Sequence, residues 1–255
     1  LDSEGYDLLG LMTGSEGLLG VITEVTVKIL KSPEVAKAAL VGFTSIQDAG
    51  NCVTEIIAKG IIPAGMEIMD KVLTKATNDF SKAGYPVDAE AMMIIELDGT
   101  DSEVSELIKR VEEIATKNKC SSIKTSKSDE ERLKFWTGRK AAFPACAELA
   151  PDYMCMDGSI PRGKLAEVLK EIQKLSVKYG LPVANAFHAG DGNLHPLIMF
   201  NANDPEQLRK TEEFGAEILK YCVKVGGALT GEHGVGVEKR ELMCEAFNDT
   251  DIQQQ

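Results

Sequence analysis

Two of the three histidines in this 255-residue sequence flank one glycine-rich turn, in the stretch FHAGDGNLHP at residues 187–196. Asp191-Gly192 predicts a two-residue hairpin loop, because a type I′ turn needs positive φ at both central positions. In a hairpin with that loop, His188 lies directly opposite His195. Directly opposed residues have Cβ atoms roughly 4.5–5.5 Å apart on one face of the sheet. Two imidazoles at that spacing can share one metal ion.

The third histidine, His233, follows Glu232 in the stretch GEHG. Two histidines and one glutamate with an open coordination position form a known catalytic ligand set. We therefore predict that His188, His195 and Glu232 bind a divalent metal, with His233 beside them. The alternative is two strand histidines and one loop histidine with ordinary hydrogen bonds; the turn geometry favours the metal site.

A second group of interest is Arg139, in the stretch KFWTGRKAAF with the only tryptophan, Trp136. Residues three apart share one face of a helix, so Trp136 can pack inward while Arg139 points toward a cleft. A guanidinium binds a small carboxylate with two parallel hydrogen bonds. The alternative is a solvated arginine beside a core tryptophan.

The third motif is GSEGLLG, at residues 14–20, which runs into the β-branched stretch VITEVTVKIL. This pattern predicts a turn that leads into a strand. Three glycines and Ser15 allow a phosphate to approach bare backbone N–H groups. The alternative is that these glycines serve a tight turn only.

Composition restricts the classes of protein to consider. A chain of this length with 44% apolar residues can bury a large core. The net charge of −12 opposes binding to nucleic acid. Apolar runs such as residues 91–95 are shorter than the roughly 18–20 residues of a membrane helix. Six dispersed cysteines without a CxxC pair exclude a zinc ribbon or iron–sulfur cluster and predict reduced thiols in a cytosolic protein.

The remaining sequence predicts the elements that hold these groups. Ser32-Pro33 marks a domain boundary, and strands and helices then follow twice in the order βαββαβ, which gives a largely antiparallel sheet with helices on one face. The first copy has strands at 35–43, 61–68, 89–97 and 120–126, with helices at 44–59 (opened by a Thr44 and Gln47 capping box), 70–80 and 100–118. One helix at 128–149 follows. The second copy has strands at 153–161, 181–188, 194–200 and 228–230, helices at 162–179 and 204–225, the GEHG loop, and a last helix from about Val237.

Three stretches then stand in one order: GLMTGSEGLLGVITEVTVKIL, NAFHAGDGNLHPLI and GGALTGEHGVGVEKREL. Together they resemble the FAD-linked oxidases of the vanillyl-alcohol oxidase type, in particular the branch of glycolate oxidase D subunits and D-lactate dehydrogenases. YMCMDGSIPR and the WTGR helix are also similar to segments of that family. The resemblance covers essentially the whole chain.

The resemblance implies a flavin-dependent enzyme that oxidises a small D-2-hydroxy acid, such as glycolate or D-lactate, to the 2-oxo acid. It implies a metal such as Zn, Mn or Fe on the predicted ligands, His233 as the base and Arg139 as the anchor of the substrate carboxylate. The other implied site residues are Asn193, His188 and His195 for the substrate, and Gly14, Ser15, Gly17, Gly20 and Ile22 for FAD.

The family's glycine-rich pyrophosphate loop and its closing NPGK-like segment are not found here, so we expect a C-terminal fragment. Residues 1–32 would be the last strands of the flavin-binding domain, and residues 33–255 a substrate-binding cap domain. Expected partners are the 2-hydroxy acid, an electron-transfer subunit or flavoprotein, and further copies of the chain, but no nucleic acid. We expect a cytoplasmic protein, peripheral to the membrane through a partner subunit. A metal-dependent hydrolase and a non-catalytic cap or subunit-interaction module remain the alternatives.

Overall fold

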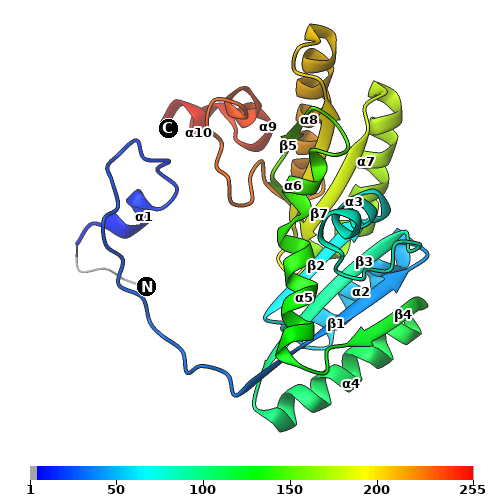
Figure 1. The fold of residues 1–255 in the computed structure, drawn as a ribbon. Coiled ribbons are helices and arrows are strands. Elements are labelled where there is room, and N and C mark those ends of the chain that lie inside the picture. Colours follow the sequence, from blue (N-terminus) through cyan, green and yellow to red (C-terminus); the bar gives the residue numbers. More distant parts are fainter. Residues whose placement is uncertain (1–4, 255) are drawn as a thin grey trace.

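The computed structural model describes residues 5–254, so the first four residues of the predicted 1–32 segment and Gln255 lie outside the described residues. The described chain forms one eight-stranded sheet in which each recorded strand pairing is antiparallel (Figure 1). The strand order is β4-β1-β3-β2-β7-β8-β5, with β6 also paired to β8. The strands are β1 (Val35–Phe43), β2 (Gly65–Asp70), β3 (Ala91–Gly99), β4 (Cys120–Thr125), β5 (Asp152–Cys155), β6 (Gly158–Ser159), β7 (Val183–His188) and β8 (Asn193–Phe200).

Two βαββαβ halves build this sheet, as predicted. In the first half, α2 (Ile46–Ala58) connects β1 to β2 and α4 (Asp101–Lys117) connects β3 to β4, and the strands lie in the order β4-β1-β3-β2. In the second half, α7 (Leu165–Tyr179) and α8 (Pro205–Lys224) occupy the corresponding positions in the chain. The fourth strand of this half is reduced to a single bridge between Ser159 and Ala228. The halves join edge to edge through β2 and β7. The α+β fold class with an antiparallel sheet is confirmed.

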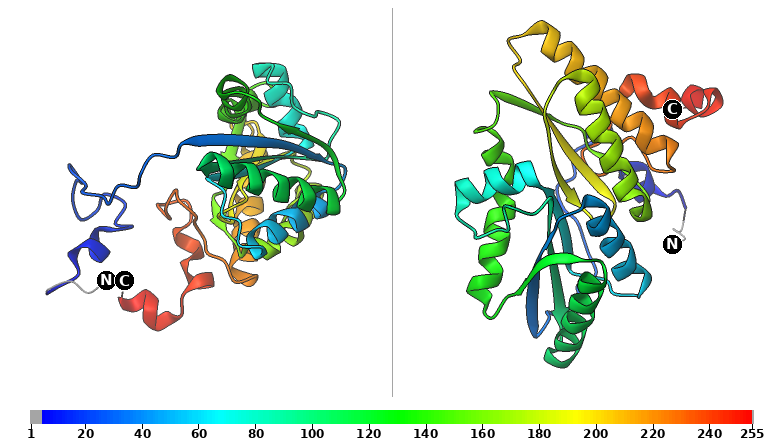
Figure 2. Two further views of the ribbon diagram at one scale, coloured as in Figure 1. Left: turned by 90° about the horizontal axis from the view of Figure 1, so that it is seen from below. Right: turned by 90° about the vertical axis from the view of Figure 1, so that its right-hand side faces the viewer.

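Helices lie on both faces of the sheet, as the views along its edge show (Figure 2). Alternate strand residues point to opposite faces. Val41 and Met93 belong to the core cluster on the face that carries α2, α4, α7 and α8, whereas Leu40 and Ile94 belong to the cluster on the face that carries α3 (Lys71–Ser81), α5 (Asp129–Lys140) and α6 (Ala142–Cys146). The four long helices α2, α4, α7 and α8 lie on one face, as predicted. The prediction did not include α3, α5 and α6, which cover the other face.

Local capping signals explain where most helices begin. Thr100 and Glu103 form the predicted capping box of α4, and Asp204 caps α8 ahead of Pro205. The capping box predicted from Thr44 and Gln47 is wrong. The N-cap of α2 is Ser45, whose hydroxyl accepts a hydrogen bond from the Asp48 N–H at 3.3 Å.

The single helix predicted over 128–149 is also wrong, because α5 ends at Lys140 and α6 starts at Ala142. The cause is Pro144. Its ring would clash with the carbonyl four residues earlier, that of Lys140, if one helix continued through it. The chain turns at Ala141 and restarts, which keeps Arg139 in the last turn of α5.

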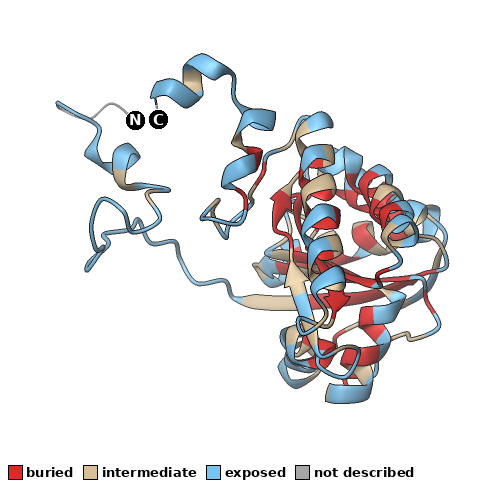
Figure 3. Ribbon diagram, turned by 90° about the horizontal axis from the view of Figure 1, so that it is seen from above, coloured by how far each residue is buried: buried red, intermediate tan, exposed pale blue. Residues whose placement is uncertain are grey.

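The N-terminal segment contains one short helix, α1 (Leu8–Met12), and then runs as a long arm away from the sheet (Figure 1). The strand predicted over 21–30 is not formed in the described structure, and residues 16–34 are all exposed (Figure 3). Its side chains are apolar and β-branched, as strand residues are, but no strand of the described chain pairs with it.

The last residues form two short helices, α9 (Met243–Ala246) and α10 (Asp249–Gln254), which lie near the N-terminal arm (Figure 2). The helix predicted from Val237 is wrong: the chain stays a loop until the 3-10 turn η2 (Arg240–Leu242). Among the described residues, no helix has the length and apolar character needed to cross a bilayer.

Candidate metal and substrate site

The hairpin between β7 and β8 differs from the predicted register by two residues. His188 pairs with Asn193, and His195 pairs with Ala186. The loop has four residues, 189–192, because the N–H groups of Asp191 and Gly192 both donate to the His188 carbonyl. A shift of two keeps the side-chain face, so the two imidazoles are diagonal neighbours with ring centroids 5.1 Å apart.

Glu232 meets these two rings from the GEHG loop. Its Oε1 lies 3.0 Å from His195 Nε2 and 3.6 Å from His188 Nε2. The ligand atoms of the three residues all lie within 4.8 Å of one another, a spacing that suits one divalent ion. The three predicted metal ligands therefore converge on the face of the sheet that carries α3, α5 and α6.

The buried ring of His195 supports the interpretation as a metal site, because it lacks hydrogen bonds within the described chain. The residue is only 2% exposed, yet neither ring nitrogen has a hydrogen-bond partner in the described chain, and the contact with Glu232 lacks hydrogen-bond geometry. A buried unpaired polar group costs free energy. Burial first, and then neighbouring His188, lowers the pKa of His195 to about 4, so its ring is neutral at neutral pH and can bind a cation through a lone pair.

Glu67 of β2 is a site residue that the sequence interpretation missed. It pairs with His188 in the sheet register, and its Oε1 lies 2.7 Å from His188 Nδ1. This hydrogen bond is the main reason that the pKa of His188 is raised. The other oxygen, Oε2, accepts from Arg139 Nε at 3.1 Å and lies 3.0 Å from Nη2. A charged residue among the apolar residues Met66, Ile68 and Met69 of the strand was the available signal.

Arg139 is buried at 7% exposure, so the alternative of a solvated arginine is wrong. Trp136, one turn earlier, donates from its indole N–H to Glu96 at 2.5 Å and is only partly buried. Asn193 is buried beside the GEHG loop, where its Oδ1 has no hydrogen-bond partner among residues 5–254. A Cβ placed on Gly231 would lie 2.3 Å from that oxygen, so only glycine allows the loop to pass this close.

Asp157, also missed from the sequence, fixes the shape of the GEHG loop. This fully buried carboxylate accepts hydrogen bonds from the Thr230 hydroxyl and from backbone N–H groups of the loop. The ammonium of buried Lys239 lies 3.2 Å away. Burial opposes ionisation, but these donors outweigh it and hold the pKa of Asp157 well below its usual range. The loop residues that donate are Gly231, Glu232 and His233.

The turn around Asp157 places the His233 ring against His195, with centroids 5.0 Å apart and planes at 22°. Asp157, His195 and His233 also lie within 4.8 Å of one another. Because Asp157 is already saturated with donors, the set with His188 and Glu232 is the better group of metal ligands. The His233 side chain is 46% exposed and is therefore accessible to a small molecule.

The GSEGLLG loop contacts this site through Glu16. Its carboxylate accepts from the N–H groups of Val235 and Gly236, which follow the GEHG stretch. Gly14 and Gly17 have φ of +80° and +79°, and a Cβ at either would meet no atom within 4 Å. The backbone here is open to a large group, which fits the predicted flavin contact. Gly20 and Ile22 are exposed and Ser15 is half-buried.

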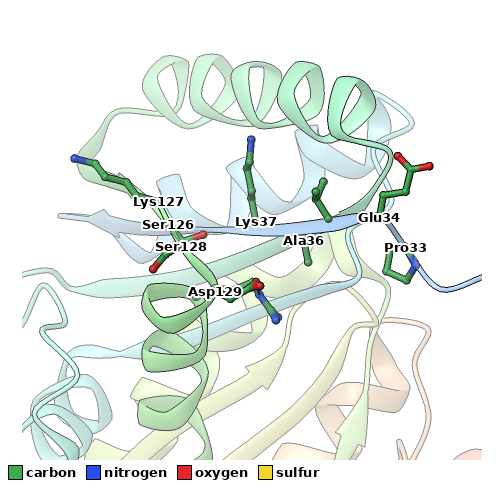
Figure 4. A pocket seen from close by; sticks show the side chains of 10 residues that line it. Pro33, Glu34, Ala36, Lys37, Ser126, Lys127, Ser128 and Asp129 are labelled. Carbon is green, nitrogen blue, oxygen red and sulfur yellow. Dashed lines mark hydrogen bonds and ion pairs between the residues drawn. The ribbon is translucent and has the colours of Figure 1, made fainter.

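A pocket of about 380 Å³ lies elsewhere, between the start of β1 and the N-terminus of α5 (Figure 4). Lys37 and Ser126 line it, and Arg132 at its wall is paired with Asp129 and Glu96. This pocket is not lined by His188, His195, Glu232 or His233. The candidate site therefore lies apart from this pocket and is identified by the types and spacing of its side chains.

Comparison with known proteins agrees with this geometry. Residues 32–254 match the family described as FAD linked oxidases, C-terminal domain. The chain is 54% identical over 252 residues to glycolate oxidase subunit GlcD of Escherichia coli (strain K12), which covers 99% of this chain and 50% of that protein. It is 37% identical to GlcD of Bacillus subtilis (strain 168), covering 93% and 51%. It is 33% identical to the mitochondrial D-lactate dehydrogenase (cytochrome) of Arabidopsis thaliana, covering 95% and 44%.

Solved structures show the same fold at low identity. Alkyldihydroxyacetonephosphate synthase aligns with a TM-score of 0.64 at 17% identity, over 98% of this chain and 50% of that one. p-Cresol methylhydroxylase with substrate bound aligns with a TM-score of 0.64 at 15% identity, over 87% and 49%. The chain spans about half the length of the curated relatives it matches. From its profile match, its relatives and its fold, this chain belongs to the family of FAD linked oxidases, C-terminal domain.

Proposed function

We propose that this chain is the substrate-binding part of a flavin-dependent enzyme that oxidises a small D-2-hydroxy acid, glycolate or D-lactate, to the 2-oxo acid. Family membership and the relatives named as glycolate oxidase subunits and D-lactate dehydrogenases support this function. In this proposal residues 33–255 form the cap domain. Residues 1–32 complete the flavin-binding domain, which would supply the strand partner that residues 21–30 lack.

The observation that carries the proposal is the convergence of His188, His195 and Glu232 around one point, with His233 stacked against His195. The ligand set of two imidazoles and one carboxylate fits Zn, Mn or Fe in the divalent state. When bound, such an ion would supply Lewis-acid stabilisation for the hydroxyl and carboxylate oxygens of the substrate.

The remaining roles follow from position. His233 accepts the hydroxyl proton, because its ring is accessible and next to the ligands. Arg139 binds the substrate carboxylate with the N–H groups that Glu67 does not use. Asn193 Oδ1, which is buried and has no partner in the described chain, accepts a hydrogen bond from the substrate.

FAD would contact the loop of Gly14, Ser15, Gly17, Gly20 and Ile22. Glu16 holds this loop beside the GEHG stretch, so the cofactor and the proton acceptor would face the same substrate. FAD supplies the redox chemistry, and the protein supplies orientation and charge.

We place the enzyme in the cytoplasm, where its six free cysteines stay reduced, and at the membrane through an electron-transfer subunit or flavoprotein. Homo-oligomers are compatible with this arrangement.

A metal-dependent hydrolase would use the same three ligands to activate water, but it gives no function to the glycine loop and does not fit the family. A non-catalytic cap module would bind metal without supporting flavin reduction. Flavin reduction by a D-2-hydroxy acid separates the oxidase from both alternatives.

The test compares Glu232→Gln with His233→Ala in the full-length protein. Glu232→Gln removes a ligand, so metal and activity should fall together. His233→Ala should keep metal and bound flavin but slow flavin reduction by D-lactate or glycolate at least ~100-fold, as loss of a general base does. Stopped-flow absorbance and metal analysis measure both. Flavin that no D-2-hydroxy acid reduces in the wild type would overturn the oxidase, and metal loss in His233→Ala would make His233 a ligand.

A further inference from the structure

We infer that Glu67 is a positioning residue for the metal site, because its carboxylate determines which nitrogen of His188 faces the metal. The inference rests on the proposed function, since it assigns a role to a residue behind the proposed ligands. Glu67 comes from the first half of the sheet and His188 from the second, so β2 and β7 have to pair before the contact exists.

The geometry gives the two oxygens of Glu67 separate partners. Oε1 lies 2.7 Å from His188 Nδ1, and Oε2 accepts from Arg139. The Glu67 side chain is 10% exposed and that of Arg139 is 9% exposed. A buried carboxylate without a partner would be costly, and Arg139 balances its charge. This ion pair therefore keeps a negative oxygen in place behind the imidazole.

The chemistry of the acceptor then fixes the tautomer. An ionised carboxylate has no proton to donate, so the proton in this hydrogen bond belongs to His188 Nδ1. In the neutral ring the lone pair is then on Nε2. That nitrogen is the one that lies 3.6 Å from Glu232 Oε1, on the side of the proposed metal. A carboxylate bound to the far nitrogen of a histidine ligand orients the ring and makes it a stronger base.

Glutamine at position 67 would reverse this arrangement. An amide has one acceptor oxygen and one donor NH2 group, whereas His188 and Arg139 both require an acceptor. If the amide oxygen faces the guanidinium, the NH2 group faces Nδ1 and forces the proton onto Nε2. The nitrogen on the metal side is then blocked. Aspartate at the same position remains acceptor-only and should retain the tautomer.

The experiment measures Zn²⁺ affinity and the tautomer of His188 in the full-length protein. Zn²⁺ affinity is titrated against a chelator. The tautomer is measured by ¹⁵N NMR of histidine-labelled, metal-free protein at alkaline pH, with the signal assigned by its loss in His188→Ala. The variants are Glu67→Gln, Glu67→Asp and Glu96→Gln. Glu96 is the matched control, because it is a part-buried carboxylate on the neighbouring strand β3 that pairs with Arg132 and touches no histidine.

We expect Glu67→Gln to lower Zn²⁺ affinity by about 10- to 100-fold and to move the His188 proton from Nδ1 to Nε2. Glu67→Asp should keep the proton on Nδ1, and Glu96→Gln should leave both measurements at the wild-type values. An unchanged tautomer in Glu67→Gln, or an equal loss of affinity in Glu96→Gln, would overturn the inference. If the wild type binds no Zn²⁺, the proposed metal chemistry fails on its own, and the tautomer measurement alone decides the role of Glu67.

Discussion

A buried imidazole without hydrogen bonds is uncommon in a folded protein, and His195 has none within the part of the chain that the structure describes. Its burial between β8, the GEHG loop and Phe143 leaves it neutral, with both nitrogens unpaired. An ion shared with His188 and Glu232 would pair one of those nitrogens. The unpaired state of His195 thus indicates a ligand more strongly than exposed acidic groups elsewhere on the chain do.

This leads to a prediction for the two hairpin histidines. His188→Ala and His195→Ala should each lose most of the bound divalent metal, because each removes one of three ligands, and each should remain folded. Metal analysis of the purified full-length variants, together with circular dichroism, checks this. His233→Ala is the matched control and should retain its metal; wild-type metal content in both hairpin variants would exclude the site.

Arg139 carries a second prediction. Arg139→Lys keeps the positive charge but loses the planar fork that contacts Glu67 and, in our proposal, the substrate carboxylate. We expect kcat/KM to fall by about tenfold or more, mainly through KM. The control is Arg132→Lys, on the same helix but paired with Glu96. Wild-type kinetics in Arg139→Lys would remove Arg139 from the substrate site.

The sequence was sufficient to predict that His188, His195 and Glu232 come together, since glycine-rich turns and rare histidines are local signals. It was insufficient for Glu67 and Asp157. Glu67 is 121 residues from His188 along the chain, and Asp157 is 76 residues from His233. Their importance arises only when the sheet and the loop bring them to these partners.

At the scale of elements, the GEHG loop has no helix or strand of its own, and Asp157 supplies its internal support. Three consecutive backbone N–H groups and the Thr230 hydroxyl converge on one carboxylate. Lys239 closes the arrangement from the other side with a hydrogen bond of 2.6 Å to the Asp157 carbonyl. The loop is consequently shaped before any ligand arrives.

We predict that Asp157→Asn lowers the free energy of unfolding by about 3–5 kcal/mol, because it leaves the buried Lys239 charge without its partner. Glu90→Gln breaks the half-exposed pair with Lys71 and should cost less than about 1 kcal/mol. Urea unfolding of each variant gives the comparison. Equal, small losses in both would mean that the loop does not depend on Asp157.

The β7–β8 hairpin shows which features could be predicted from neighbouring residues alone. Asp191-Gly192 correctly predicted a turn between the two histidines. The predicted register was wrong by two residues, and because two is an even number the histidines still lie on the same face of the sheet. The hairpin loop is also held by a contact outside the hairpin, since the Gly190 N–H donates to the Met66 carbonyl on β2. Helix starts such as those of α4 and α8 were predictable because their caps lie within three residues of the first turn.

For the whole molecule, the described chain divides into a packed body and an extended arm. Trypsin should therefore cut this chain first in the arm, at Lys28 or Lys31, because both are exposed and outside every helix and strand. Mass spectrometry of the first fragments tests this. Lys71 serves as the comparison, since it is exposed but lies in α3. First cleavage at Lys71 would show that the arm is packed in solution.

The two halves of the body meet along three residue pairs of β2 and β7, whereas β1 and β3 share nine. The site spans this short seam, because Glu67 lies on one side and the histidines on the other. In our proposal, metal binding and the docking of the halves are therefore thermodynamically linked: an ion that prefers the joined arrangement would stabilise the seam by RT ln(1 + [L]/Kd). In return, any substitution that loosens the seam would weaken the affinity for the proposed ion, even when it contacts no ligand.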